Sequence, residues 1–234
     1  LAAVARRLTK PVPRAKTPTV NLLGATPLDF PLHGAIPDMI AWLQEAGYRV
    51  QSTWAMGSTL EELCGAGAAW VNLVISSTGL PAAQALQEKF GTPYVVGTPA
   101  GQAFGRVLLE HLACSAHTGR SSVAFADCEP DGAGIILGEA VTARSLAAAI
   151  GLERGAAPQV LCPLEAPPGL LSGGDAAMRA ECDLEQRLRT AAWVAADPLY
   201  RPIVPAQTPF YSLPHPAFSG RLWRGQMVNL VKHL

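Results

Sequence analysis

The sequence predicts an α/β protein with two Rossmann-like three-layer domains and mainly parallel sheets. Three observations support this fold class. Short runs that are almost wholly apolar recur along the chain, which is typical of strands covered on both faces. Segments with apolar residues at helical spacing follow these runs. Small polar or glycine-rich turns separate the two kinds of segment, so strands and helices are expected to alternate.

The clearest unit spans residues 71–101. Its first strand, Val71 to Ile75, ends at a small polar turn. A helix is expected to begin near Pro81, where the missing N–H has no partner to lose, and to end at Gly91. Residues 94–96 form the second strand. A right-handed crossover between two parallel strands is the natural interpretation.

The rest of the first half repeats this pattern. Strands are expected at residues 19–24 and 48–54, and helices at residues 36–47 and 102–116. Ser58 should cap a short helix, because Glu61 follows it at capping-box spacing. Residues 19–118 are therefore expected to form one Rossmann-like domain, preceded in residues 1–18 by the tail of a helix and a proline-rich linker.

The alternation restarts in the second half, which is expected to form a second, less regular α/β domain over residues 119–234. Strands are expected at residues 122–126, 159–162, 192–196 and 210–213. Helices are expected at residues 141–152, 175–189 and 225–234. The chain begins with Leu1 rather than Met, so we expect it to be part of a longer protein.

Composition excludes several classes of partner. Lys and Arg together number 18, as do Asp and Glu, so there is no electrostatic footprint for nucleic acid or an anionic membrane. No apolar run approaches the roughly 20 residues that span a bilayer, and a cytoplasmic protein is expected. The five cysteines are widely spaced and odd in number, which indicates buried free thiols rather than disulfides or a zinc site.

Common catalytic motifs are absent from the sequence. No G-x-G-x-x-G follows the first strand, and no P-loop or G-x-S-x-G occurs, which argues against standard nucleotide sites and serine hydrolases. What remains is a set of small polar loops where strands end: residues 26–33, 54–58, 76–79 and 98–101. In a parallel sheet these loops share one edge, where hydroxyls and helix N-termini can hold an anion or a cofactor. Ordinary turn chemistry is the alternative.

These loops give the candidate cofactor-binding residues Ser76, Ser77, Thr78, Gly79, Thr98 and Gly101. A further candidate is His215, which lies between two prolines in an aromatic-rich segment and could be a ligand, a proton donor or part of a surface turn. Arg201 could pair with Asp197 or hold an anion. Cys114 and His117 have helical spacing for two metal ligands, but structural burial of the thiol is favoured and no metal site is assigned.

Several stretches of the chain resemble the nitrogenase component 1 family, which includes molybdenum-iron protein subunits, cofactor-assembly scaffolds and dark-operative protochlorophyllide reductase subunits. They are VNLLG, LQEAGYRV, TWAMGSTLEEL and the segment VNLVISSTGLPAAQALQEKFGTPYVVGTPAG. The similarity covers most of residues 19–105, and residues 192–220 resemble the final domain of the family more loosely.

The resemblance implies three Rossmann-like domains per subunit, with iron–sulfur or other metal clusters between domains and subunits. It also implies a homologous partner subunit and an ATP-dependent iron–sulfur reductase that delivers electrons. This chain would hold two of the three domains. The cysteine that anchors the active-site cluster in the family falls at Ile75, which cannot ligate iron. The family's histidine ligand is approximated by His215 before Ser219 and Gly220, at a spacing one residue short.

Two classes of function follow. The first is a domain fragment of a nitrogenase component 1-like oxidoreductase or cofactor-assembly subunit, without its own cluster ligand and inactive when alone. The second is a two-lobed module that binds a tetrapyrrole, a metal complex or a small anion without redox chemistry, with Trp54, His215 and Trp223 lining an apolar cleft. A sugar-nucleotide transferase shares the layout but has no recognisable nucleotide motif here.

Overall fold

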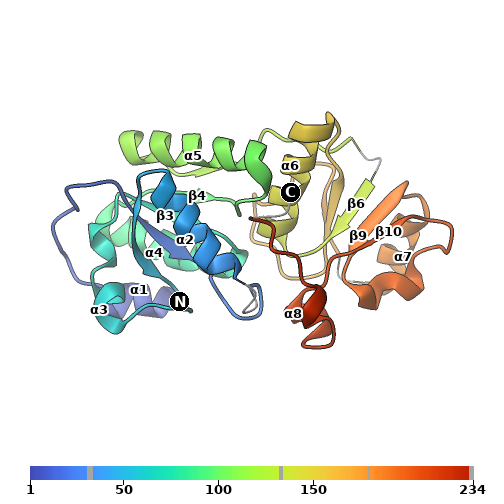
Figure 1. The fold of residues 1–234 in the computed structure, drawn as a ribbon, viewed down its shortest axis with the longest axis horizontal. Helices are drawn as coiled ribbons and strands as arrows, with labels where there is room; N and C mark the ends of the chain where they lie inside the picture. The colour runs from blue at the N-terminus through green and yellow to red at the C-terminus, as the bar shows by residue number, and fades with distance from the viewer. Residues whose placement is uncertain (31–33, 132–133, 179, 232–234) are drawn as a thin grey trace.

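The computed structural model describes residues 1–30, 34–131, 134–178 and 180–231. It contains two five-stranded sheets, in the orders β2-β1-β3-β4-β5 and β10-β9-β6-β7-β8. Every strand pair in both sheets is parallel. Figure 1 shows the two sheets side by side with helices packed around each. The predicted α/β class with parallel sheets is confirmed.

The first sheet and its helices come from residues 2–123. The strands are β1 (Thr19–Leu23), β2 (Arg49–Thr53), β3 (Val71–Val74), β4 (Tyr94–Val96) and β5 (Ser122–Val123). The helices are α1 (Ala2–Leu8), α2 (Ala35–Glu45), α3 (Leu60–Cys64), α4 (Leu80–Phe90) and α5 (Gly101–Thr118), with short 3₁₀ turns η1 (Ala66–Ala68) and η2 (Ser77–Gly79).

The second sheet and its helices come from residues 134–226. The strands are β6 (Gly134–Leu137), β7 (Gln159–Cys162), β8 (Ala176–Ala177), β9 (Trp193–Ala196) and β10 (Phe210–Ser212). The helices are α6 (Ala140–Arg154), α7 (Glu181–Arg189) and α8 (Pro216–Ser219), with 3₁₀ turns η3 (Pro198–Ile203) and η4 (Arg224–Gln226).

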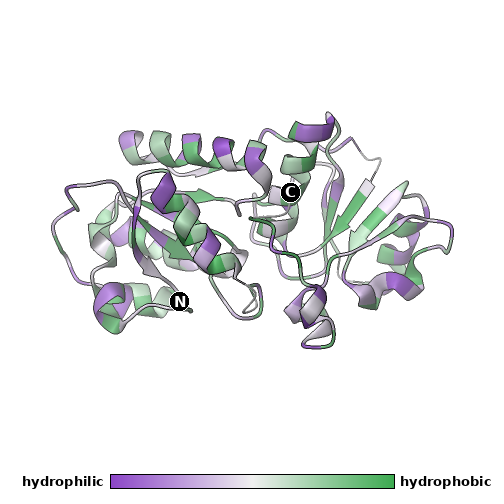
Figure 2. Cartoon of the chain, in the orientation of Figure 1, coloured by the Kyte–Doolittle hydropathy of each residue, from purple (hydrophilic) through white to green (hydrophobic). Residues whose placement is uncertain are grey.

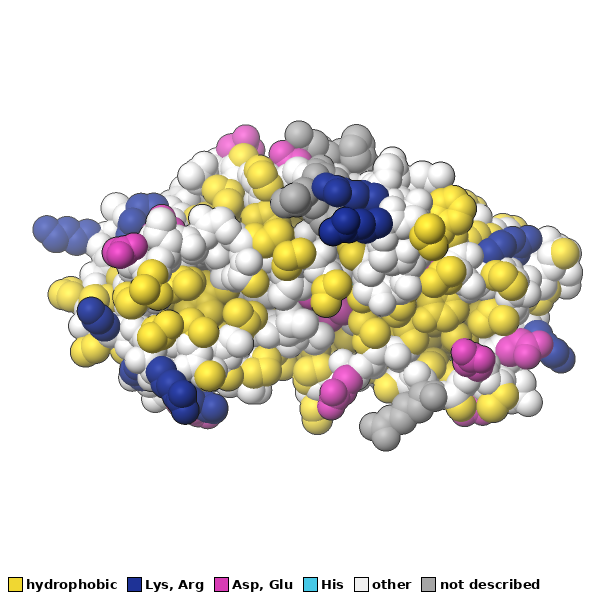
Figure 3. Space-filling model, turned by 90° about the horizontal axis from the view of Figure 1, so that it is seen from below, with side chains coloured by type: hydrophobic (Ala, Val, Ile, Leu, Met, Phe, Trp, Pro, Cys, Tyr) yellow, Lys and Arg dark blue, Asp and Glu magenta, His cyan; other side chains and the backbone are white. Residues whose placement is uncertain are grey.

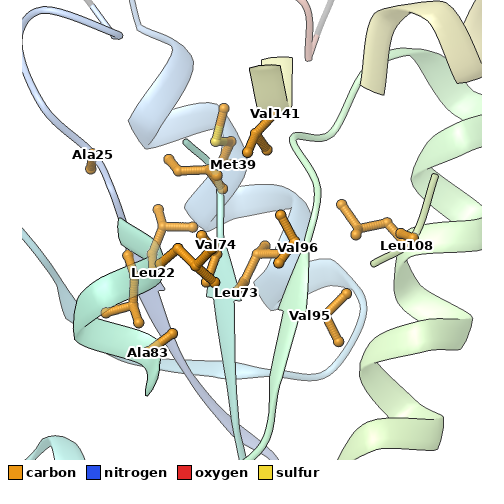
Figure 4. Close-up of a cluster of buried hydrophobic side chains, with 14 of the residues drawn as sticks. Leu22, Ala25, Met39, Leu73, Val74, Ala83, Val95, Val96, Leu108 and Val141 are labelled. Carbon is orange, nitrogen blue, oxygen red and sulfur yellow. The ribbon is translucent and has the colours of Figure 1, made fainter. Parts of the chain in front are cut away.

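The central strands are buried because their side chains are apolar on both faces. Figure 2 shows the strands as mainly hydrophobic and the outer faces of the helices as mainly hydrophilic. In Figure 4, Leu22, Leu73 and Val96 from neighbouring strands gather in one cluster, with Val141 of α6 beside them. The buried cluster of the first sheet therefore continues into the helix that follows the first strand of the second.

A polar ladder crosses the apolar core of the first sheet. Asn21 and Asn72 face each other in the register of β1 and β3, and Asn21 Nδ2 donates to Asn72 Oδ1 at 2.8 Å and to the Ala66 carbonyl at 2.9 Å. Ser52 Oγ donates to Asn21 Oδ1 at 2.7 Å, and Trp54 Nε1 donates to Ser52 Oγ at 2.8 Å. Because these side chains are fully or almost fully buried, the ladder satisfies groups that water cannot reach.

A buried ion pair joins α6 to Asp175, the residue before β8. Arg144 Nη1 lies 3.2 Å from Asp175 Oδ2, and both side chains are at most 1% exposed. Arg144 Nη2 also donates to the carbonyls of Phe125 at 3.1 Å and Cys128 at 2.6 Å. Asp175 was expected to begin a helix, but it instead bonds Val160 N–H and Ser172, and α7 begins at Glu181.

Three further expectations for local structure were wrong. Thr59 and Glu62 form the capping box of α3, while Ser58 Oγ accepts from Thr53 N–H. The strand expected at 122–126 is only two residues long and pairs with β4, so it ends the first sheet rather than opening the second. Among residues up to 231, the expected terminal helix is reduced to η4.

The division into domains at residue 118 stays a prediction. No helix within the described ranges has both the length and the apolar character needed to cross a membrane.

Candidate functional site

The carboxyl ends of the two sheets meet around a small cavity. Its volume is about 70 Å³. The first sheet contributes the loop after β1 and Thr98, and the second contributes Glu139 and the segment around His215. Apolar side chains form most of the wall: Phe30, Ala35, Met39, Leu137, Ala143, Leu146, Leu213, Pro214, Pro216, Met227, Val228 and Leu230. The loops after parallel strands were expected to share such an edge.

The loop after β3 supplies a chain of hydroxyl groups. The Ser76 and Thr78 hydroxyl oxygens lie 2.6 Å apart, and Ser76 Oγ donates to the Gly24 carbonyl at 2.9 Å. Thr78 Oγ1 donates to Asp29 Oδ2 at 3.3 Å. Gly79 is required here, because a Cβ would lie 2.6 Å from the Leu23 carbonyl oxygen. The loop is thus held against the end of β1 rather than open to a ligand.

Glu139 connects α6, which follows β6 of the second sheet, to the loop after β3 of the first sheet. Its carboxylate is the N-cap of α6, where it accepts from Val141 N–H at 3.2 Å and from Thr142 N–H and Oγ1 at 3.0 and 2.8 Å. Its Oε1 also accepts from Ser77 N–H at 2.9 Å. The backbone donor predicted to hold an anion at residues 76–79 is therefore occupied by a carboxylate of the same chain.

The loop after β4 is also tied to the second half. Thr98 N–H donates to Ser145 Oγ at 2.9 Å, and Thr98 Oγ1 donates to the Ile75 carbonyl at 2.6 Å. Gly101 N–H donates to the Leu230 carbonyl at 3.3 Å. Thr98 lines the cavity, whereas Gly101 does not. These contacts lie at the junction between the sheets.

His215 faces the cavity from the second half. Its Nδ1 accepts from Ala217 N–H at 3.2 Å, which makes the ring the N-cap of α8. Its Nε2 is buried, has no hydrogen-bond partner among the described residues, and lies 3.9 Å from Asp29 Oδ1. Burial lowers the pKa of His215, although the Asp29, Glu139 and Asp197 carboxylates raise it in part. The ring is therefore neutral near pH 7.

Asp197 organises the segment that carries His215. It accepts from His215 N–H at 2.8 Å, from Ser219 Oγ at 2.7 Å and from Leu199 N–H at 2.9 Å. Ser219, which was predicted to bind a cofactor, is thus buried and its hydroxyl is bonded to Asp197. Of the two roles suggested for Arg201, the pairing with Asp197 is not formed, because Arg201 donates to the Pro205 and Ala206 carbonyls, and the role in holding an anion stays a prediction.

A second hollow lies next to the cavity on the outer surface. It has a volume of about 340 Å³ and shares Pro216 and Met227 with the cavity wall. Gly220, another predicted site residue, lines it together with Arg221 and Arg224. Figure 3, which views the molecule from below Figure 1, shows basic side chains next to hydrophobic ones near the middle of this face. Gly220 is therefore outside the cavity that His215 faces.

The proposed apolar cleft of Trp54, His215 and Trp223 does not form. Trp54 is fully buried, and its ring nitrogen is bonded to Ser52. Trp223 is exposed and lines neither hollow. His33, at the end of the loop predicted at residues 26–33, lies outside the described residues.

Sequence reasoning did not single out the carboxylates as site residues. Asp29, Glu139 and Asp197 each follow a buried strand, and Glu139 and Asp197 also precede a helical turn, where a carboxylate is a good N-cap. That position was the available signal. The approach of Asp29 to His215 could not be predicted from this position, because the two residues belong to different sheets.

Thiol groups are absent from the described residues that line the cavity. Ile75 is fully buried in the core of the first sheet. Burial raises the pKa of the Cys162 thiol to about 11, so this cysteine is protonated at neutral pH. No group of three or more His, Cys, Asp or Glu side chains in the described ranges is arranged to hold a metal ion.

Residues 1–123 match the family model described as nitrogenase component 1 type oxidoreductase. The chain is 34% identical over 97 residues to a subunit of the light-independent protochlorophyllide reductase of Prosthecochloris aestuarii, a match that covers 41% of this chain and 18% of that protein. The corresponding subunits of Chloroflexus aggregans and Leptolyngbya boryana are 32% identical over 97 residues and 35% identical over 89, each over 18% of their length.

Two solved structures, titled Nitrogenase Cp1 at pH 5 and at pH 6.5, are also similar. The first aligns with a TM-score of 0.48 at 15% identity, over 79% of this chain and 41% of that one. The second aligns with a TM-score of 0.46 at 14% identity, over 79% and 44%.

Proposed function

This chain belongs to the family of nitrogenase component 1 type oxidoreductases, and from that premise we propose that it forms two adjacent domains of an oxidoreductase or cofactor-assembly subunit. In this proposal the chain holds no active-site cluster through a cysteine of its own. The observation that carries it is the chemistry of the junction between the sheets. The polar groups there are carboxylates, hydroxyls and one imidazole, without a thiolate among the described residues.

A cluster does not fit the residues present. Ile75 stands where the family resemblance places the anchoring cysteine, and its side chain is enclosed by the core. His215 is held by its backbone and by Nδ1, and its free Nε2 points at a carboxylate rather than at sulfur ligands. Iron–sulfur clusters need several thiolates. The chain would therefore work beside clusters that other subunits supply.

The proposed partners are a homologous subunit and an ATP-dependent iron–sulfur reductase. The matched relatives are themselves named as subunits, and the match covers less than a fifth of their length. In such a complex the chain's own residues would bind and orient a substrate or cofactor at the junction of the sheets and shield it from water. A cytoplasmic location belongs to the same proposal.

Anaerobic reconstitution tests the absence of a cluster. The chain is incubated with ferrous iron, sulfide and a thiol reductant, desalted, and analysed for bound iron and for the visible absorption of a cluster. We expect iron well below one equivalent per chain. A stoichiometric cluster that is lost when Cys162 or another cysteine is replaced by serine would refute the proposal.

A second candidate is a tetrapyrrole-binding module without redox chemistry, which is favoured by the protochlorophyllide reductase name of the relatives. The cavity of about 70 Å³ is far below the roughly 300–1,000 Å³ of typical ligand pockets. Binding would therefore require the contacts of Glu139 and Ser145 across the junction to open. Magnesium protoporphyrin should then raise the melting temperature. An unchanged melting curve at saturating porphyrin would exclude this candidate.

A further inference from the structure

Two polar atoms of the described residues, His215 Nε2 and Asp29 Oδ1, face each other in the cavity between the sheets without a direct hydrogen bond between them. His215 Nε2 has no hydrogen-bond partner in the described ranges, although the atom is buried. Asp29 Oδ1 lies 3.9 Å away, too far for a direct hydrogen bond. Both residues line the cavity. A buried polar atom without a protein partner is costly, so this pair is suited to a polar group that bridges the two atoms.

The role of His215 is fixed by its other nitrogen. Nδ1 accepts a hydrogen bond from Ala217 N–H, so the neutral ring carries its proton on Nε2. Protonation of the ring would place a second N–H against Ala217 N–H. Burial, which lowers the pKa of His215, acts in the same direction. His215 therefore presents a neutral N–H donor to the cavity.

The role of Asp29 is equally defined. Its Oδ2 accepts from Thr26 Oγ1 at 2.8 Å and from Thr78 Oγ1 at 3.3 Å, which fixes the orientation of the carboxylate. Its Oδ1 accepts no hydrogen bond from the described residues and faces His215. An occupant must therefore present an acceptor to His215 and, next to that acceptor, a donor to Asp29.

The charge and size of the cavity restrict the occupant further. Asp29 and Glu139 both line it, and Asp197 lies behind His215, so an anion would be repelled. The neutral N–H of His215 disfavours a cation at the same point. A cavity needs at least about 10–15 Å³ of internal space to hold one water molecule, so about 70 Å³ accommodates a few waters or one small ring. Leucine and methionine side chains around the pair favour an apolar ring.

We propose that this cavity binds a neutral cis-amide, such as a lactam ring, whose carbonyl accepts from His215 Nε2–H and whose N–H donates to Asp29 Oδ1. A cis-amide carries its oxygen and its N–H on one edge, which matches a donor and an acceptor 3.9 Å apart. The site rests on the proposed function, because it names the kind of group that would be oriented there. It assigns His215 and Asp29 as the residues that determine specificity.

A matched set of small ligands tests this proposal on the full chain. The probes are 2-pyrrolidinone, N-methyl-2-pyrrolidinone and γ-butyrolactone, which share the five-membered ring and differ in the N–H group. Binding is followed by NMR, through the resonance of the His215 Nε2–H proton and a titration of each probe. 2-Pyrrolidinone should shift this resonance in a saturable manner and bind about tenfold or more tightly than the other two, because they leave the Asp29 carboxylate unpaired.

Two variants separate recognition from folding. His215→Asn keeps an N-cap acceptor for Ala217 N–H, but its shorter side chain places no N–H at the position of Nε2, so it should lose lactam binding while the protein stays folded. Asp29→Asn can donate to a lactone oxygen, so it should reduce the preference for lactam over lactone. Asp127→Asn, at an exposed position on the other side of α6, is the control and should bind as the unmodified chain does.

Equal affinity for the three probes, or no lactam binding to the folded chain, would overturn the proposal. Retained lactam binding in folded His215→Asn would do the same. Cluster reconstitution is independent of these titrations. The lactam site can thus fail while the chain still lacks a cluster, and a cluster can appear while the lactam still binds.

Discussion

Glu139 is one of the side chains that join the two sheets. It accepts hydrogen bonds from Val141 and Thr142 at the start of α6, and one from Ser77 N–H in the loop after β3. Glu139→Asp shortens the side chain by one methylene group. Aspartate is a good N-cap, so the bonds to α6 should be kept while Ser77 is no longer reached. The variant therefore isolates the bond across the junction.

The expected effect follows from that one bond. A hydrogen bond to a charged group contributes about 1.5–3 kcal/mol, and about 1.4 kcal/mol corresponds to tenfold in an equilibrium. The Ser77 amide should therefore exchange its hydrogen about ten to a hundred times faster in Glu139→Asp. Native-state hydrogen exchange, read at residues 76–79 and at the first turn of α6, measures both ends of the contact.

The control is Glu185→Asp on α7. Glu185 pairs with Arg189 at 2.7 Å on an exposed helix face, and such a pair contributes about 0–1 kcal/mol. Exchange at Ser77 should be unchanged in this variant. If Glu139→Asp also left the Ser77 amide as slow as before, the carboxylate would not hold the sheets together. Faster exchange confined to α6 would mean that the variant had damaged the cap instead.

Other perturbations give further tests. Asn21→Ala should lower the free energy of unfolding in urea by about 2–4 kcal/mol, because it leaves Asn72 Oδ1 and other buried groups unpaired, and an undiminished midpoint would contradict this. Lys89→Met should speed proteolysis of α1 without lowering the global midpoint, because Lys89 Nζ donates to the carbonyls of Arg6 and Thr9 at the end of that helix. The lowered pKa of His215 means that the unfolded chain binds more protons than the folded chain just below pH 6.5. Stability should therefore fall as the pH drops through that range, and His215→Asn should flatten the slope in urea melts recorded from pH 7 to 5.

The central apolar strands could be predicted because their own side chains determine their burial. Residues 71–74 and 94–96 lie where the sequence places them. Strand β5 was misplaced and β8 was missed, because two-residue edge strands exist only through pairing with a neighbour. The capping box was displaced by one residue because Ser58 and Thr59 are both competent caps and the competing bond from Thr53 decides between them.

The site was only partly predictable. The loops at residues 76–79 and 98–101 follow parallel strands, so their position at the sheet edge could be anticipated. The sequence could not reveal that Glu139 fills the Ser77 donor or that Asp29 faces His215. Those contacts depend on how two sheets, encoded about a hundred residues apart, come together.

Arg144 ties the segment that leaves the first sheet to α6. Ala124 N–H is bonded to the Val96 carbonyl and so moves with the first sheet, whereas the Phe125 carbonyl is bonded to Arg144 and moves with α6. The Cys128 carbonyl is also bonded to Arg144, so residues 125–128 are held to α6 at two points. Since Ala126 N–H also donates to the Val123 carbonyl across this point, a rotation of one sheet against the other at residues 124 and 125 would have to stretch that bond as well, so the two sheets are not joined here by a free linker.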